Sequence, residues 1–123
     1  MKKILIIDDE PQILLLLSNR LKVNGYAVIT ASSGEEGLEK TKKEMPDLVL
    51  LDQVMPAMDG REVLDHLKKD PLTKHIPVLI FTADVKKVKV KEVQMRGAAD
   101  CLFKPFSPEE LLDKVKEVFN KKS

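Results

Sequence analysis

Five polar residues with complementary side chains each follow a short apolar run in this sequence. They are three carboxylates, a hydroxyl and an ammonium: Asp8, Asp9, Asp52, Thr82 and Lys104. Three carboxylates held close together repel one another by on the order of a few kcal/mol per pair, so such a cluster is expected to hold a cation. Oxygen ligands, with no histidine or second cysteine nearby, favour Mg²⁺ over zinc. The hydroxyl and the ammonium would then suit phosphoryl oxygens.

The strongest strand signal is the run Leu48–Leu51, which Asp52 closes and the turn signal Pro46-Asp47 precedes. A short unbroken apolar run is typical of a strand buried on both faces of a parallel sheet. Open α/β sheets bind their ligands at the carboxyl edge of such strands. Taken alone, Asp52 would serve equally well as a cap for the segment that follows it. The polar residues at the other strand ends favour the interpretation that Asp52 belongs to a binding site.

The same strand-then-helix pattern occurs five times along the chain. The predicted strands cover residues 4–7, 26–30, 48–52, 78–81 and 99–102, and the predicted helices cover 11–23, about 33–44, 60–69, 85–96 and a last segment from 108. Ser32 and Ser33 each precede a glutamate by three residues, so either can cap the second helix. Alternating strands and helices predict a parallel sheet with helices on both faces. Residues 86–93 also fit a strand, but the parallel connection requires a crossover helix there.

Composition indicates one ordinary globular domain over residues 1–123. The chain is 43% hydrophobic and 33% charged, with a net charge of +1, which argues for neither direct nucleic-acid binding nor membrane binding. Cys101 is the single cysteine and cannot form an internal disulfide. No secretory leader or membrane span is visible, so we expect a cytoplasmic protein.

The chain resembles the response-regulator receiver domains of two-component signalling along essentially its whole length. The motifs that carry the resemblance are Asp8-Asp9, Asp52 with Met55-Pro56 and Asp59-Gly60, Thr82-Ala83, Gly97-Ala98 and Lys104-Pro105-Phe106. The resemblance implies an α/β flavodoxin-like (βα)5 fold, a doubly wound parallel five-stranded sheet in the strand order 2-1-3-4-5. It also implies a phosphoacceptor module of a two-component system or phosphorelay, similar to single-domain chemotaxis regulators.

The resemblance assigns a role to each motif residue. Asp52 would accept the phosphoryl group from a histidine of a sensor kinase or a phosphotransfer protein. Asp9, Asp52 and the main-chain carbonyl of Val54 would bind Mg²⁺, with Asp8 acting through a bound water. Lys104 would pair with the phosphoryl group and Thr82 would donate a hydrogen bond to it. A cis peptide is expected between Lys104 and Pro105, which proline makes accessible.

One position departs from the family pattern, and two others are expected to tune the lifetime of the acyl phosphate. Cys101 stands where receivers usually carry a switch aromatic, so the usual coupling of hydroxyl and ring is not expected here. We expect Cys101 to be a small core residue rather than a redox centre, and Phe103 to point to the opposite face of its strand. Val54 lies two residues after Asp52 and is apolar, so it cannot orient a water by hydrogen bonding. This predicts slow autodephosphorylation. The alternative is that Asp84, two residues after Thr82, compensates for Val54.

The first helix offers a candidate docking patch. Ile13 and Leu16 lie beside the predicted core stripe, where receivers contact a histidine-bearing helical bundle; filling a wide core contact is an equal alternative. The resemblance implies a monomer or a weak phosphorylation-dependent dimer that catalyses only its own phosphorylation and dephosphorylation. The alternative function is a Mg²⁺-dependent phosphatase with an aspartyl nucleophile. Such an enzyme would carry an aspartate as general acid where this chain has Val54.

Overall fold

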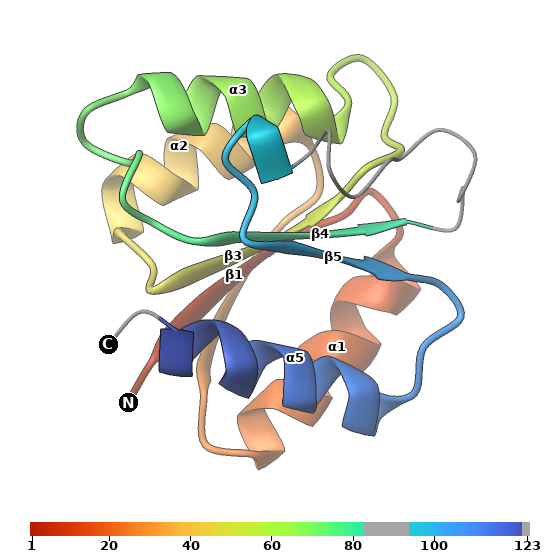
Figure 1. The fold of residues 1–123 in the computed structure, drawn as a ribbon. Coiled ribbons are helices and arrows are strands. Elements are labelled where there is room, and N and C mark those ends of the chain that lie inside the picture. The colour runs from red at the N-terminus through yellow and green to blue at the C-terminus, as the bar shows by residue number, and fades with distance from the viewer. Residues whose placement is uncertain (83–93, 122–123) are drawn as a thin grey trace.

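A parallel sheet in the order β2-β1-β3-β4-β5 forms the centre of the molecule (Figure 1). The computed structural model describes residues 1–82 and 94–121. The strands are β1 (Lys3–Ile7), β2 (Ala27–Ala31), β3 (Leu48–Asp52), β4 (Val78–Thr82) and β5 (Asp100–Phe103). The helices are α1 (Pro11–Val23), α2 (Gly34–Glu44), α3 (Gly60–Lys69) and α5 (Pro108–Lys121). This is the strand order and fold class that the family resemblance implied.

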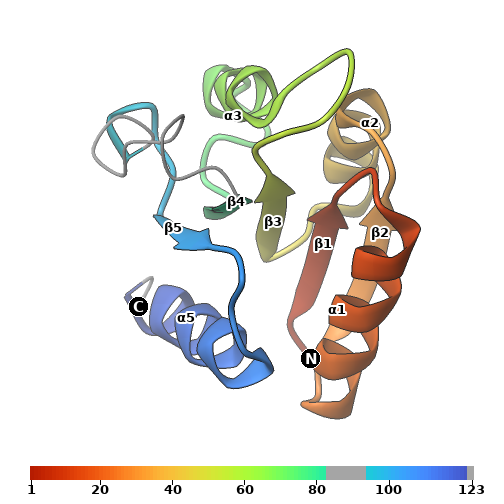
Figure 2. The same cartoon turned by 90° about the vertical axis from the view of Figure 1, so that its right-hand side faces the viewer.

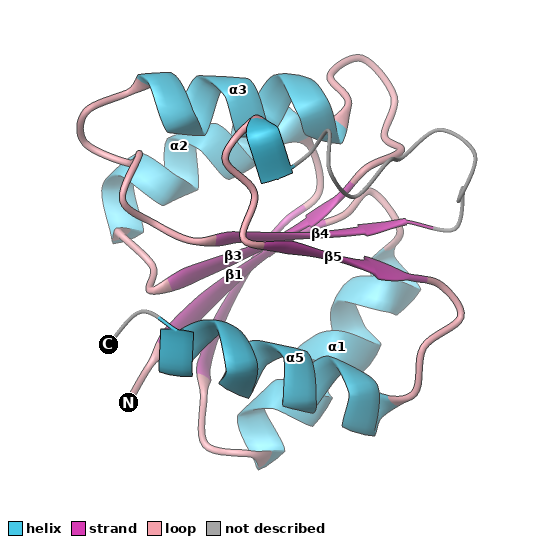
Figure 3. Cartoon of the chain, viewed as in Figure 1, coloured by secondary structure: helices cyan, strands magenta, loops and turns pink. Residues whose placement is uncertain are grey.

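The helices cover both faces of the sheet, α2 and α3 on one side and α1 and α5 on the other (Figure 3). Each face has its own apolar core. Val63, Leu64 and Leu67 of α3 pack on one face, and Leu17 and Leu21 of α1 pack on the other. The residues of β3 and β4 are all buried, as expected for central strands whose two faces are both covered.

The predicted boundaries hold to within about one residue. α1, α2 and α3 end where the sequence predicted, while β2 and β5 begin and end one residue later than predicted and β4 extends to Thr82. Residues 83–93 hold most of the predicted fourth helix and lie outside the described residues. No helix in the described ranges is long and apolar enough to cross a membrane.

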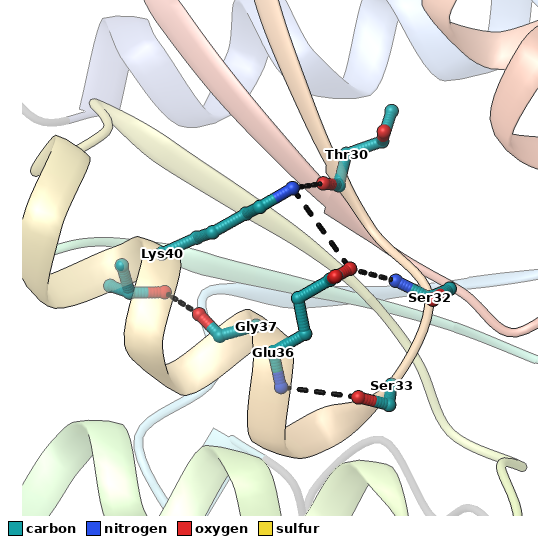
Figure 4. A network of polar contacts seen from close by, with 7 residues as sticks. Thr30, Ser32, Ser33, Glu36, Gly37 and Lys40 are labelled. Atoms are coloured by element: carbon teal, nitrogen blue, oxygen red, sulfur yellow. Dashed lines mark hydrogen bonds and ion pairs between the residues drawn. The ribbon is translucent and has the colours of Figure 1, made fainter.

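Local capping explains where α2 begins. The Ser33 hydroxyl accepts a hydrogen bond from the Glu36 amide at 3.1 Å, and the Glu36 carboxylate accepts one from the Ser32 amide at 2.7 Å (Figure 4). Of the two serines that could cap this helix, Ser33 is therefore the N-cap. The arrangement satisfies amide groups that the first turn of a helix leaves unpaired.

All strands run in the same direction, so their carboxyl ends meet at one edge of the molecule (Figure 2). In the register of the sheet, Ile7 pairs with Leu51 and Asp52 pairs with Phe81. The polar residues that follow these strands are thereby brought to a common edge.

Candidate functional site

Three carboxylates gather at the carboxyl edge of β1 and β3. One oxygen from each of Asp8, Asp9 and Asp52 lies within 4.8 Å of the other two. Asp8 is fully buried and Asp52 is 4% exposed, whereas Asp9 is half-buried. Because Ile7 and Leu51 are register partners, the residues that follow them are neighbours across the sheet. The predicted acidic cluster is confirmed.

Main-chain hydrogen bonds fix the strand ends that carry the cluster. The Asp8 amide donates to the Ala31 carbonyl at 3.1 Å, and the Gln53 amide donates to the Phe81 carbonyl at 3.0 Å. The Asp8 carboxylate accepts a hydrogen bond from the Glu10 amide through Oδ1, while its buried Oδ2 has no hydrogen-bond partner among residues 1–82 and 94–121. A buried carboxylate oxygen without a donor is costly, and a bound cation would relieve that cost.

Lys104 supplies the positive charge at this edge. Its Nζ lies 3.6 Å from Asp8 Oδ2 and 3.9 Å from Asp52 Oδ1, close enough for attraction but too far for a direct hydrogen bond. The Lys104 amide donates to the carbonyl of Thr82, the buried last residue of β4, at 2.7 Å. The Lys104-Pro105 peptide is cis, as predicted. The ammonium thus lies between two carboxylates without a hydrogen bond to either of them.

The charges of the cluster are not balanced by Lys104 alone. Burial and the nearby charge of Asp8 raise the pKa of Asp52 to about 7, against the opposing effect of Lys104. Burial likewise raises the pKa of Asp8. Three carboxylates and one ammonium leave two negative charges, and carboxylate oxygens are the ligands that Mg²⁺ prefers. The donor set therefore fits a divalent cation.

The positions beside the cluster correct one prediction. Cys101 is buried, as expected, and both burial and the Asp100 carboxylate raise the pKa of its thiol to about 11. Phe103 was predicted to point to the opposite face of the strand, and this was wrong. Cys101 and Phe103 both pack on the core beneath α2 and α3, because residues two apart on a strand share a face.

A groove next to Lys104 joins α1 to the loop that follows β5. Its lining residues are mostly apolar: Ile13, Leu16, Leu17, Arg20, Lys104, Pro105, Phe106 and Pro108. Leu16 is 56% exposed, and Ile13 packs partly on the core. The two residues singled out in the sequence therefore line one groove at the edge of the acidic site. His66 and His75 are exposed, and the groove contains neither.

The site also contains a residue that sequence patterns do not single out. The Lys104 ammonium lies 5.0 Å from the centroid of the Phe81 ring. In the sequence, Phe81 is one apolar residue of a buried strand, and no spacing rule distinguishes it from its neighbours. Only the direction of the Lys104 side chain reveals the contact.

Comparisons with known proteins agree with this geometry. Residues 4–116 match the response regulator receiver domain family. The chain is 45% identical to the alkaline phosphatase synthesis transcriptional regulatory protein PhoP of Bacillus subtilis, over 98% of this chain and 49% of that protein. It is 36% identical to Protein PilH of Pseudomonas aeruginosa, over 96% of this chain and 98% of PilH. The chain spans about half the length of PhoP and nearly all of PilH.

Solved structures give the same assignment. The chemotaxis protein CheY4 of Vibrio cholerae superposes with a TM-score of 0.89 at 36% identity, covering 96% of this chain and 98% of that one. A receiver domain protein from Clostridium thermocellum gives a TM-score of 0.91 at 33% identity, covering 99% and 97%. Fold, acidic site and sequence agree: the chain belongs to the response regulator receiver domain family, the phosphoacceptor signalling modules of two-component systems.

Proposed function

We propose that residues 1–123 form one receiver domain in which Asp52 accepts a phosphoryl group from a phosphohistidine. The observation that carries this proposal is the Lys104 ammonium 3.9 Å from Asp52, beside two further carboxylates. An Asp52 oxygen attacks phosphorus, the bond from phosphorus to the donor imidazole breaks, and its electron pair returns to the ring nitrogen. The product is an acyl phosphate on Asp52.

Asp8, Asp9 and Asp52, with the main-chain carbonyl of Val54, are the groups that would hold Mg²⁺, Asp8 acting through a water. When bound, the ion neutralises negative charge on the phosphoryl oxygens. Asp8 keeps a buried oxygen without a hydrogen-bond donor, which supports this assignment. Lys104 donates to a phosphoryl oxygen from the other side, and the hydroxyl of buried Thr82 donates to another.

The donor histidine would come from a sensor kinase or a phosphotransfer protein that docks on the groove containing Ile13 and Leu16. The groove is apolar, carries Arg20 on its lining, and includes Lys104 of the phosphoacceptor site. An apolar patch this close to the nucleophile suits a helix that presents a phosphohistidine. We place this exchange in the cytoplasm and infer that the domain catalyses only its own phosphorylation and dephosphorylation.

Phosphorylation by a small donor tests the role of Asp52. The protein is incubated with acetyl phosphate and Mg²⁺, and its intact mass is measured. We expect the wild type to gain one phosphoryl group and Asp52→Asn to gain none. Asp113→Asn changes an exposed carboxylate of α5 and should be labelled like the wild type. An unlabelled wild type, or a labelled Asp52→Asn, would contradict the proposal.

Leu16→Glu separates docking from chemistry. This change puts a charge into the apolar groove without touching the carboxylates, so labelling by acetyl phosphate should stay within about twofold of wild type. Transfer from a phosphorylated histidine-bearing bundle should fall by about tenfold or more, because a carboxylate would be desolvated at the contact. Leu72→Glu is the matched control, since Leu72 is 64% exposed and is not among the residues that line the groove. Equal transfer to both variants would exclude this docking surface.

A further inference from the structure

The Lys104 ammonium lies over the Phe81 ring, 5.0 Å from its centroid. An ammonium within about 6 Å of an aromatic centroid is attracted by the negative face of the ring, more strongly where water is excluded. We infer that Phe81 is the positioning residue for Lys104. Its ring keeps the ammonium between Asp8 and Asp52, where the ammonium can donate a hydrogen bond to a phosphoryl oxygen. This inference rests on the proposed function and adds a residue to it.

The carboxylates alone do not fix the ammonium. Its distances to Asp8 and Asp52 are 3.6 and 3.9 Å, both beyond hydrogen-bond length. A lysine side chain has four rotatable bonds and loses considerable rotamer entropy when it is held in one conformation. The contact with the ring face limits the ammonium to one region without a hydrogen bond. Because both carboxylates lie beyond hydrogen-bond length, the N–H donors of the ammonium are not committed to them and can turn to the phosphoryl group.

The ring itself is firmly held. Phe81 is 1% exposed and belongs to the core beneath α1 and α5. The Phe106 ring meets it edge-on, with centroids 6.2 Å apart and an interplanar angle of 86°. Edge-to-face pairs of this kind are favourable and directional. Phe81 thus has a fixed orientation, which a support for a mobile side chain requires.

Main-chain pairing links the Phe81 ring to both Asp52 and Lys104. Phe81 pairs with Asp52 in the register of β3 and β4, and its carbonyl accepts the hydrogen bond from the Gln53 amide. The stem of Lys104 is fixed by the bond from its amide to the Thr82 carbonyl, one residue after Phe81. The nucleophile, the ring and the lysine are therefore linked through adjacent strands within a few bonds.

Fluorinated phenylalanines test the role of the ring without changing its shape. Each added ring fluorine weakens the negative face, so mono-, di- and trifluorophenylalanine at position 81 should slow labelling by acetyl phosphate and Mg²⁺ in that order. Phe81→Leu should slow it by about 2- to 30-fold, the factor that corresponds to a contact of this kind. Urea unfolding of each fluorinated protein verifies that the fold is retained.

Phe119 provides a matched control within the same chain. Lys2 Nζ lies 5.4 Å from the Phe119 ring centroid, and Tyr26 packs against that ring at 5.9 Å. Phe119 is on α5, and Lys2 and Tyr26 directly precede β1 and β2, at the edge of the sheet opposite the carboxylates. The same fluorinated series and Phe119→Leu should leave the labelling rate unchanged.

A second readout needs neither Mg²⁺ nor phosphorylation. Protons above a ring face resonate upfield, so the Lys104 methylene protons should be shifted upfield in wild type and should lose that shift in Phe81→Leu but not in Phe119→Leu. An unchanged Lys104 signal, or unchanged labelling across the fluorinated series, would overturn the inference while Asp52 is still labelled. A wild type that takes up no phosphoryl group would instead overturn the proposed function, and this inference with it.

Discussion

Cys101 and Phe103 lie on the same face of β5 and pack on the same core cluster, beneath α2 and α3. Phe103 is also the register partner of Thr82, and Cys101 the partner of Ile80. The aromatic ring of this strand therefore lies beside the residue predicted to donate to the phosphoryl group. Cys101, the smaller of the two, pairs with Ile80 and so lies further from the carboxyl edge of the sheet. Its position is the one at which receivers usually carry an aromatic ring.

Introducing an aromatic residue at position 101 should crowd this cluster. Cys101 is 7% exposed, so Cys101→Tyr is expected to lower the free energy of unfolding by about 1 to 3 kcal/mol. If Phe103 competes for the same space, adding Phe103→Ala should cost less in Cys101→Tyr than in wild type. A double-mutant cycle by urea unfolding measures this coupling. Strictly additive effects would show that the two side chains do not share the space.

The raised pKa of Asp52 makes stability depend on pH when Mg²⁺ is removed. Its value of about 7 exceeds the ordinary 3.8, so the folded state binds this proton more tightly than the unfolded chain. The stabilisation is complete below the unfolded pKa and is lost as pH rises through about 7. In EDTA, Asp52→Asn should exceed wild type in unfolding free energy by on the order of 1 to 3 kcal/mol at pH 8.

At pH 5 this advantage of Asp52→Asn should be clearly smaller, because the wild-type carboxyl is then protonated in the folded state. Chemical unfolding at the two pH values measures the difference. Asp113→Asn, which alters an exposed carboxylate, should differ from wild type in unfolding free energy by the same amount at both pH values. A gap between Asp52→Asn and wild type that does not change with pH would argue against a destabilising charge at Asp52.

The acidic site could be predicted from the sequence because parallel strands bring their carboxyl ends to one edge. Once residues 4–7, 48–52 and 78–81 are recognised as parallel strands, Asp8, Asp52 and Thr82 must lie at the same edge of the sheet. The order of the strands required the family resemblance, since local patterns do not determine which strands pair. The cis Lys104-Pro105 peptide was likewise expected from the resemblance.

Side-chain direction was the part that sequence reasoning did not supply. The contact between Phe81 and Lys104 depends on the rotamer of a long side chain beyond the end of β5. The error at Phe103 came from assigning opposite faces to residues that are two apart on a strand. The face of Phe103 could have been read from the two-residue repeat of a strand. The contact of Lys104 with Phe81 could not, because apolar patterning specifies side chains only as buried or exposed.

Gly60 should be sensitive to any added side chain, because α3 begins against the end of β3. A Cβ at Gly60 would lie 2.7 Å from both the Asp52 carbonyl oxygen and Gln53 Cα, and these backbone atoms cannot move without displacing Asp52, the proposed nucleophile. Gly60→Ala should cost about 1 to 3 kcal/mol of unfolding free energy and slow labelling of Asp52.

Gly25→Ala is the control for stability. Gly25 has a φ of +91° with open space around its missing Cβ, so alanine there should cost about 1 to 2 kcal/mol through backbone strain alone. Its labelling by acetyl phosphate should match wild type. If Gly60→Ala were also labelled at the wild-type rate, the close packing of α3 on the strand end would have no role in positioning Asp52.

Val54 is predicted to lengthen the lifetime of the phosphorylated state. It is 53% exposed, and its amide donates to Asp52 Oδ1 at 3.4 Å. Its apolar side chain would offer no hydrogen bond to a water that attacks the proposed acyl phosphate. Val54→Asn supplies an amide that can orient that water. Phosphate release should accelerate by about 2- to 13-fold, the factor that corresponds to one hydrogen bond.

The lifetime is measured by following phosphate release after excess acetyl phosphate is removed, with Mg²⁺ present throughout. Val23→Asn is the matched control, because Val23 is an 80% exposed valine in the last turn of α1 and should not affect release. Slower release from Val54→Asn than from wild type would contradict the prediction. Val54 would then speed hydrolysis by admitting water to the acyl phosphate, instead of slowing it by offering that water no hydrogen bond.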